Sequence, residues 1–374
     1  MRKAAICVIA AGVASALLLG ACSSSKSKSG SSSSSAGGSA SSSKIQVGVI
    51  LPDTTSSNRY TAFDAPLLTK AFQTAGIKAD VQNAGGSTSK YASIAQSMIG
   101  EGISVLIMDS IDATSGAAIE QQAKTAGVKV IDYDRVNLGG SADYYLSFDN
   151  QKVGQLQAQT LITCLNGVSN PQVIEMDGGT DVDNNAVLFK AGAQSVFNTA
   201  QGQGKLKVVS DTVVKGWDVS LAAPAFTQAL TANGNKVDGV YAANDDIANA
   251  VVGVLKSNGL AGKVQVTGQD ATVPGLQNIL QGNQCMTIFK SYADEADAAA
   301  KLATALIKNQ NPSTAGLSLT SFNDPKGNRT LQAVLLTPKV ITKANVEDVV
   351  KSGQSTVAQI CNGIQAACTS AGVS

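Results

Sequence analysis

The chain of 374 residues carries 28 basic and 27 acidic side chains and contains no histidine. The near balance of charge argues against a nucleic-acid partner, and the lack of histidine removes the commonest general base and the commonest metal ligand. Neither a Gly-x-Ser-x-Gly elbow nor a phosphate-binding loop occurs in the sequence. Composition and motifs therefore favour a binding protein, without a cofactor, over an enzyme.

Residues 1–21 predict a secretory signal peptide, because two basic residues precede an apolar stretch too short to span a bilayer and a small-residue cleavage site. Cys22 follows that site directly, which is the mark of a bacterial lipoprotein, and we expect it to carry a lipid. An ordinary signal peptide with an incidental cysteine is the alternative. Residues 22–43 are almost all Ser, Gly, Ala and Lys, as in a flexible tether. We therefore expect an exported protein anchored at the extracellular face of the cell membrane.

From residue 44 onward, short apolar runs rich in β-branched residues alternate with helical stretches. The first series has strands at 44–51, 78–83, 105–109 and 128–133, with helices at 63–75, 91–100 and 116–126 between them. The second series has helices at 151–165, 186–201, 220–231 and 247–257, and strands at 172–176, 207–211, 239–242 and 264–267. Repeated strand–helix units predict parallel sheets with helices on both faces. Two successive series predict two α/β lobes.

Four cysteines follow the predicted lipid site, at positions 164, 285, 361 and 368. An even number in an exported chain suggests two disulfides. Cys361 and Cys368 are close in sequence and would form a small loop, which leaves Cys164 to pair with Cys285. Three pairings are possible in principle. The spacings match no zinc pattern, so no metal site is expected.

Polar side chains gather just after the predicted strands, where ligands bind in open parallel sheets. Charged and amide groups suit a polyol, because every hydroxyl both donates and accepts a hydrogen bond. The single tryptophan offers a flat face to a sugar ring. Taken singly, these residues have ordinary alternatives as surface ion pairs, helix caps or core, but together they fall on one face. The candidates are Arg59, Tyr60, Asp134, Arg135, Asp183, Asn185, Trp217, Asn244, Asp270 and Lys290.

These residues also carry a resemblance to periplasmic sugar-binding proteins of the ribose-binding superfamily, above all to D-xylose-binding proteins. The resemblance covers about residues 45 to 355 and includes Asn58-Arg59-Tyr60, Tyr133-Asp134-Arg135, Val182-Asp183-Asn184-Asn185-Ala186, Lys215-Gly216-Trp217, Ala243-Asn244-Asp245, Gly268-Gln269-Asp270-Ala271 and Met286-Thr287-Ile288-Phe289-Lys290. It implies a first lobe of residues 44–148 plus 291–330 and a second of residues 149–290 plus 331–374. It also implies three hinge crossovers, near 147–150, 290–292 and 325–335.

The resemblance implies a monomer that closes on a monosaccharide, D-xylose first, and delivers it to the permease and ATPase of an ABC transporter. The motif match places Arg59, Asp134 and Arg135 on the sugar from the first lobe, and Trp217 on the ring. From the second lobe or the hinge it places Asp183, Asn185, Asn244, Asp270 and Lys290. D-xylose binders tend to carry tryptophan where Tyr60 stands. Ribose, arabinose and galactose therefore stay open as ligands. A sensor that presents a sugar to a membrane receptor is the other alternative.

Overall fold

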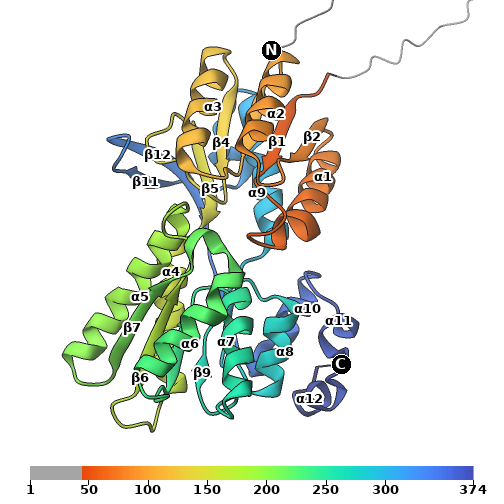
Figure 1. Ribbon diagram of the computed structural model, residues 1–374. Helices are drawn as coiled ribbons and strands as arrows, with labels where there is room; N and C mark the ends of the chain where they lie inside the picture. The colour runs from red at the N-terminus through yellow and green to blue at the C-terminus, as the bar shows by residue number, and fades with distance from the viewer. Residues whose placement is uncertain (1–43, 374) are drawn as a thin grey trace, which may run out of the picture. The chain divides into compact units, whose positions relative to one another are not determined.

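The computed structural model describes residues 44–373, so the predicted signal peptide, Cys22 and the tether lie outside the described residues. Residues 44–373 form two α/β lobes with mainly parallel sheets (Figure 1), as the two strand–helix series predict. Within this part of the chain, no helix is long and apolar enough to span a bilayer.

The first lobe is built on a seven-stranded sheet in the order β11-β12-β5-β4-β3-β1-β2. Its pairs are parallel except that of β11 with β12. Helices α1 and α9 bury one face of this sheet, and α2 and α3 bury the other, so two apolar cores form. The elements are β1 (Val47–Leu51), η1 (Tyr60–Asp64), α1 (Ala65–Thr74), β2 (Ala79–Asn83), α2 (Thr88–Gly100), β3 (Val105–Met108), α3 (Ala113–Thr125), β4 (Lys129–Tyr133), β5 (Tyr144–Phe148), α9 (Tyr292–Ile307), η4 (Pro312–Ala315), β11 (Thr320–Asp324) and β12 (Arg329–Leu336).

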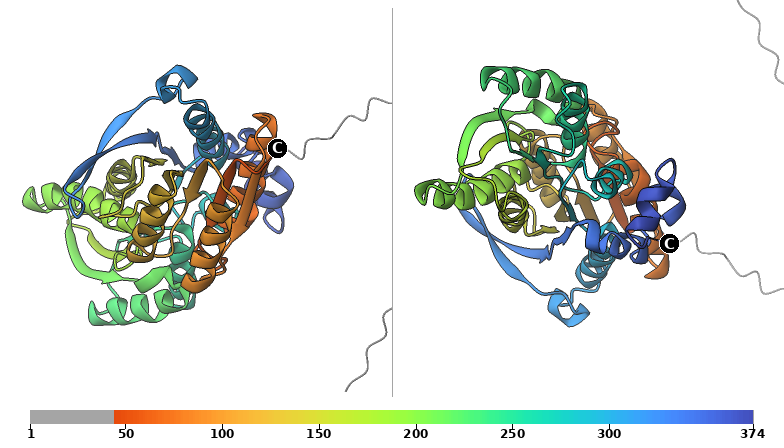
Figure 2. Two further views of the ribbon diagram at one scale, coloured as in Figure 1. Left: turned by 90° about the horizontal axis from the view of Figure 1, so that it is seen from above. Right: turned by 90° about the horizontal axis from the view of Figure 1, so that it is seen from below.

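The second lobe is built on a four-stranded parallel sheet in the order β7-β6-β8-β9, beside a two-stranded sheet of β10 and β13. Its C-terminal helices lie beside α8 (Figures 1 and 2) and share an apolar core with it. The elements are α4 (Asn150–Cys164), β6 (Gln172–Asp177), α5 (Asn184–Gly202), β7 (Lys207–Val213), η2 (Lys215–Trp217), η3 (Val219–Leu221), α6 (Ala222–Ala232), β8 (Gly239–Ala242), α7 (Asp245–Ser257), β9 (Gln265–Val266), α8 (Val273–Gln281), β10 (Thr287–Phe289), β13 (Lys339–Ile341), η5 (Lys343–Asn345), α10 (Glu347–Lys351), α11 (Val357–Cys361) and α12 (Gln365–Ser370).

Helices α4 and α5 pack against each other at unusually short range. A Cβ on Gly154 of α4 would collide with the carbonyl oxygen of Phe189, and one on Gly192 of α5 would collide with that of Gln151. Glycine at both positions therefore lets the two backbones touch. As a result, the first turns of α4 and α5 lie together at the end of the lobe that faces the first lobe.

Three short segments carry the chain between the lobes. The first follows β5 and leads into α4, the second joins β10 to α9, and the third joins β12 to β13 through residues 337–338. The first two lie within the predicted ranges. The third was predicted near 325–335, and that prediction is wrong.

Residues 325–328 instead form the turn between the antiparallel strands β11 and β12. In the turn between β11 and β12, the Asp324 carboxylate accepts hydrogen bonds from the backbone N–H groups of Lys326 and Gly327. The chain therefore doubles back, and β12 pairs in parallel with β5. Residues 331–336 consequently belong to the first lobe, not to the second.

Both predicted disulfides are confirmed. Cys164, the last residue of α4, is bonded to Cys285, which precedes β10. Cys361 of α11 is bonded to Cys368 of α12. The first disulfide ties together segments 121 residues apart in the second lobe, and the second ties together neighbouring helices at the C-terminus.

Two carboxylates of β6 are buried near Lys190 of α5. Glu175 and Asp177 are each 1% exposed. Lys190 Nζ lies 2.7 Å from Asp177 Oδ2 and 2.6 Å from Asp211 Oδ1. Burial, with the neighbouring carboxylate second, raises the pKa of Glu175 to about 8. Burial likewise raises the pKa of Asp177 to about 7.

Because these pKa values are higher in the folded chain than in the unfolded one, we expect the free energy of unfolding to fall as pH rises from the ordinary carboxyl range toward 8. Glu175→Gln should flatten this decline and stabilise the protein at pH 8, as urea unfolding at pH 5, 6.5 and 8 would show. Glu101→Gln, on the exposed end of α2, is the control. If the free energy of unfolding changed with pH equally in Glu175→Gln and in the unaltered protein, the raised pKa assigned to Glu175 would be contradicted.

Candidate functional site

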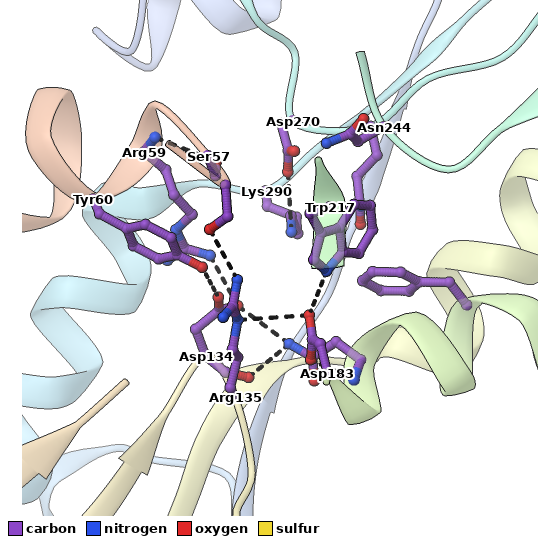
Figure 3. A pocket seen from close by; sticks show the side chains of 14 residues that line it. Ser57, Arg59, Tyr60, Asp134, Arg135, Asp183, Trp217, Asn244, Asp270 and Lys290 are labelled. Carbon is purple, nitrogen blue, oxygen red and sulfur yellow. Dashed lines mark hydrogen bonds and ion pairs between the residues drawn. The ribbon is translucent and has the colours of Figure 1, made fainter. Parts of the chain in front are cut away.

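One cavity between the lobes is lined by all ten residues that the sequence analysis selects (Figure 3). The space between the lining atoms, including the part that is open to solvent, is about 350 Å³. Each of the ten side chains belongs to a residue that is at most 9% exposed. The structure therefore brings together residues that are up to 231 positions apart in the sequence, from Arg59 to Lys290.

Arg59, at the start of η1, lies among three carboxylates. Its guanidinium lies 2.7 Å from Asp64, 2.9 Å from Asp134 and 2.6 Å from Glu295. The ring of Tyr292 lies 4.5 Å from the guanidinium carbon, a cation–π distance. Although burial opposes its charge, Asp134, Asp64 and Glu295 raise the pKa of Arg59 well above its ordinary value. The arginine is therefore a fixed, permanently charged part of the cavity wall.

Glu295, in the first turn of α9, is the most unusual member of this group. The residue is fully buried, and burial raises the pKa of its carboxyl to about 8 despite the nearby Arg59. Burial thus favours the neutral form of this carboxyl, whereas Arg59 at 2.6 Å favours the charged form.

Arg135 connects several walls of the cavity. Its terminal nitrogens donate to Ser56 Oγ (3.2 Å) and to the carbonyl oxygen of Ser110 (3.4 Å). Its Nε lies 3.6 Å from Asp183 Oδ2 and 3.9 Å from Asp109 Oδ1. Because Asp183 belongs to the second lobe, Arg135 makes a charge contact across the lobe boundary.

Three residues of the lining have left-handed backbone. The φ angles of Asp134, Trp217 and Asp270 are 58°, 59° and 94°. Residues other than glycine adopt this region rarely and at a cost, and such strain concentrates at functional sites. The conformation turns the chain sharply after β4, after β7 and after β9, and so directs side chains into the cavity instead of along the sheet.

Trp217 rests on the backbone of Gly178 and Gly179. Its Nε1 donates to Asp183 Oδ2 (3.1 Å), and its ring meets the edge of Phe189 with centroids 6.4 Å apart. Asp183 Oδ1 accepts from the backbone N–H of Asn185 (2.8 Å) and so caps α5. Both oxygens of Asp183 are thus engaged by protein groups, and this residue positions the indole ring.

The packing of Trp217 leads to a direct test. A Cβ on Gly178 would overlap the indole ring, so Gly178→Ala should displace Trp217 and cost about 1–3 kcal/mol of stability. Because Trp217 is the only tryptophan, its fluorescence should shift to longer wavelength and become more accessible to a soluble quencher. Gly253→Ala in α7, where a Cβ meets open space, is the matched control. Unchanged emission in Gly178→Ala would contradict this packing.

Asp270 and Lys290 form the remaining charged pair. Lys290 Nζ lies 3.0 Å from Asp270 Oδ1 and 5.7 Å from the ring centroid of Phe189. Nearby, Asn244 Oδ1 accepts from the backbone N–H of Ile247 and so caps α7. Lys290 comes directly after β10 in the second crossover, so this pair lies at the hinge.

Several buried polar atoms of the lining are incompletely satisfied within residues 44–373. Gln269 Oε1 has no hydrogen-bond partner there. Arg135 Nε, Arg59 Nη1 and Asp270 Oδ1 have only ion-pair contacts. A buried donor or acceptor without a partner costs about 1–3 kcal/mol. The cavity is therefore suited to a ligand with many hydroxyl groups, which can donate to some of these atoms and accept from others.

The sequence analysis missed four residues of the lining, namely Ser56, Ser57, Phe189 and Gln269. Gln269 precedes Asp270 at a strand end, and the two serines follow β1. All three are polar residues after a predicted strand, and the same criterion could have selected them. Phe189 lies within α5, where nothing in the local pattern separates it from a core residue. In the described part of the chain, no cluster of three or more acidic, cysteine or histidine side chains is arranged to hold a metal ion.

Comparison with known proteins gives concordant results. Residues 47–311 match the family model described as periplasmic binding protein domain. The chain is 37% identical to the D-xylose-binding periplasmic protein of Escherichia coli K12, over 78% of this chain and 85% of that one. It is 34% identical to a multiple sugar-binding periplasmic receptor of Rhizobium radiobacter, over 82% and 89% of the two chains.

A solved structure is also similar over most of the chain. The carbohydrate transporter solute-binding protein from Chloroflexus aurantiacus, in complex with D-glucose, matches with a TM-score of 0.76 and 29% identity, over 84% of this chain and 97% of that one. These relatives are solute-binding proteins, not enzymes.

Proposed function

Because the chain belongs to the periplasmic binding protein family, we propose that it works as a monomer that captures a monosaccharide in the cavity between its lobes and delivers it to an ABC importer. D-xylose is the first candidate, since the Escherichia coli relative is named for that sugar. The observation that most supports a sugar is the set of buried, incompletely satisfied polar atoms around the cavity.

The charge pattern favours a neutral polyol over an ion. Arg59, Arg135 and Lys290 each face a carboxylate at 3.6 Å or less, so no cation of the lining is left to attract an anionic ligand. Hydroxyl groups can instead bridge these pairs, because each donates to a carboxylate and accepts from a cation. Trp217 supplies an apolar face for the C–H groups of the ring.

Capture and delivery follow from the arrangement of the lining on both lobes. A sugar that contacts both lobes favours the closed form over the open one. The importer then recognises the closed protein. Cells that lack the chain should accordingly lose uptake of the labelled sugar, whereas a purely sensory role would leave uptake unchanged.

The choice of sugar depends in part on Tyr60. Its hydroxyl lies 3.3 Å from Asp134 Oδ2, and its ring contacts the guanidinium groups of Arg59 and Arg135 at 5.7 and 5.6 Å. The tyrosine hydroxyl thus competes with a sugar hydroxyl for Asp134. Ribose, arabinose, galactose and glucose therefore remain alternatives to D-xylose.

The proposal is tested by following Trp217 fluorescence while sugars are added to the purified protein. Because Trp217 is the only tryptophan and lines the cavity, a bound sugar should change its emission in a saturable manner. D-xylose should saturate the change at the lowest concentration. A folded protein whose emission responds to none of these sugars would refute the proposal.

We also propose that Cys22 carries a lipid and holds the protein at the extracellular face of the membrane. The support comes from its place directly after the predicted cleavage site and before the Ser-rich tether. Cys22→Ser should move the protein from the membrane fraction to the medium or periplasm and abolish incorporation of labelled fatty acid. Retention of the label in Cys22→Ser would contradict this assignment, and an unlabelled parent protein would favour an ordinary signal peptide.

A further inference from the structure

A hydrogen-bond network joins the two lobes beside the cavity, and its centre is Asn185. Asn185 Oδ1 accepts from the Tyr145 hydroxyl (3.0 Å) and from Asn150 Nδ2 (2.8 Å). Asn185 Nδ2 donates to the main-chain carbonyl of Asp134 (2.8 Å) and lies 3.4 Å from the Asp134 carboxylate. Both ends of the Asn185 amide are therefore engaged by protein groups, although this residue lines the cavity.

The partners of Asn185 come from both sides of the lobe boundary. Tyr145 lies in β5, and its ring is anchored within the first lobe by an edge-on contact with Phe322, with centroids 5.0 Å apart. Asn150 begins α4 on the other side of the first crossover, and its Nδ2 also lies 3.2 Å from Ser147 Oγ. The contact of α4 with α5 brings Asn150 and Asn185 together. Neither Tyr145 nor Asn150 lines the cavity.

The same network supports the strained backbone of Asp134. Its φ is 58°, and its carbonyl oxygen accepts from Asn185 Nδ2 (2.8 Å). The Tyr145 hydroxyl lies 3.1 Å from the same oxygen, so its single proton is shared between this oxygen and Asn185 Oδ1. The carboxylate of the same residue pairs with Arg59 at 2.9 Å. Contacts that hold the main chain of Asp134 thus also hold a charged group of the cavity wall.

We propose that Tyr145 and Asn150 are positioning residues that hold the closed lobes together through Asn185. They thereby change the affinity for every ligand of the cavity by the same factor. A group that stabilises the closed form without touching the ligand changes how much of the protein is closed and able to bind. It does not change the ratio of affinities between ligands. The inference rests on the proposed function, since affinity for a sugar is its readout.

The test compares Tyr145→Phe and Asn150→Ala with the unaltered protein by calorimetric titration against every sugar that the unaltered protein binds. Loss of one such hydrogen bond should raise each Kd about three- to tenfold. The ratios between sugars should stay constant, and dissociation should accelerate. In the double variant, Tyr145→Phe should raise the Kd little beyond its value in Asn185→Ala alone, because the two residues belong to one hydrogen-bond network.

Tyr91→Phe is the matched control, because its hydroxyl is buried within the first lobe and lies 3.4 Å from the carbonyl oxygen of Ile50. It should lower thermal stability without changing any Kd. Altered sugar ratios in Tyr145→Phe, or an unchanged Kd in both Tyr145→Phe and Asn150→Ala, would overturn the inference. If the unaltered protein bound no sugar, the proposed function would fail on its own. Small-angle scattering would then test the inference without a ligand. Tyr145→Phe and Asn150→Ala should each have a larger radius of gyration than the unaltered protein, and profiles identical to that of the unaltered protein would overturn the inference.

Discussion

Replacement of Asp270 by alanine is expected to abolish measurable sugar binding while the chain stays folded. The change removes the carboxylate that lies 3.0 Å from Lys290 Nζ and leaves that buried ammonium without its partner. Truncation of one partner of a buried charge pair in a binding site costs about 2–5 kcal/mol of affinity, which corresponds to a Kd at least about 30-fold higher. Titration calorimetry gives the affinity, and circular dichroism shows whether the fold is intact.

The backbone at this position calls for a second variant. Asp270 has a φ of 94°, which alanine tolerates poorly, so Asp270→Ala adds local strain to the loss of charge. Asp270→Asn keeps the shape of the side chain and suits left-handed backbone better. It should still lose most of the binding, because the charge is absent. Unchanged affinity in either variant would count against this site.

Replacement of Arg59 by methionine is expected to have the largest effect on stability. It leaves Asp64, Asp134 and Glu295 close together without the guanidinium that contacts all three. Removing the cation from such a buried cluster should cost about 3–5 kcal/mol in the free energy of unfolding. Urea unfolding at pH 7 measures that loss. The loss should shrink as pH falls, because the carboxyl groups then take up protons.

Arg329→Met is the control for this experiment. Arg329 pairs with Asp324 at 3.1 Å, but its side chain is 25% exposed and lies away from the cavity. Its replacement should cost clearly less than that of Arg59 and leave sugar affinity unchanged. Equal losses of stability in the two variants would mean that repulsion among the three carboxylates around Arg59 does not lower the free energy of unfolding.

The alternation of strands and helices made much of this fold predictable. Strands such as β1 and β3 are short, apolar and buried along their whole length, so their sequence pattern is plain. Parallel strands also bring their carboxyl ends to one edge of their sheet, and this rule placed Asp134 at that edge of the first sheet and Asp270 at that edge of the second. The hairpin of β11 and β12 lies beyond residue 267, where the sequence analysis predicted no helix or strand.

The support of the site was less predictable than its lining. Glu295 contacts Arg59 from 236 residues away, on a helix outside the two predicted series. Tyr145 lies in β5, a strand that the sequence analysis did not predict, and its hydroxyl reaches Asn185 in the other lobe. Contacts of this kind depend on how segments distant in the sequence pack together. The local pattern of apolar and polar residues carries no information about that packing.

The most direct test of the central claim is titration calorimetry of the purified protein with D-xylose, and with ribose, arabinose, glucose and galactose in parallel. We predict binding of one sugar per chain, tightest for D-xylose, because all ten candidate residues line one cavity and several of its buried polar atoms lack a hydrogen-bond partner within residues 44–373. Tighter binding of another of these sugars would keep the cavity as the site and make Tyr60 the first residue to exchange. A folded protein that binds none of the five would contradict the account.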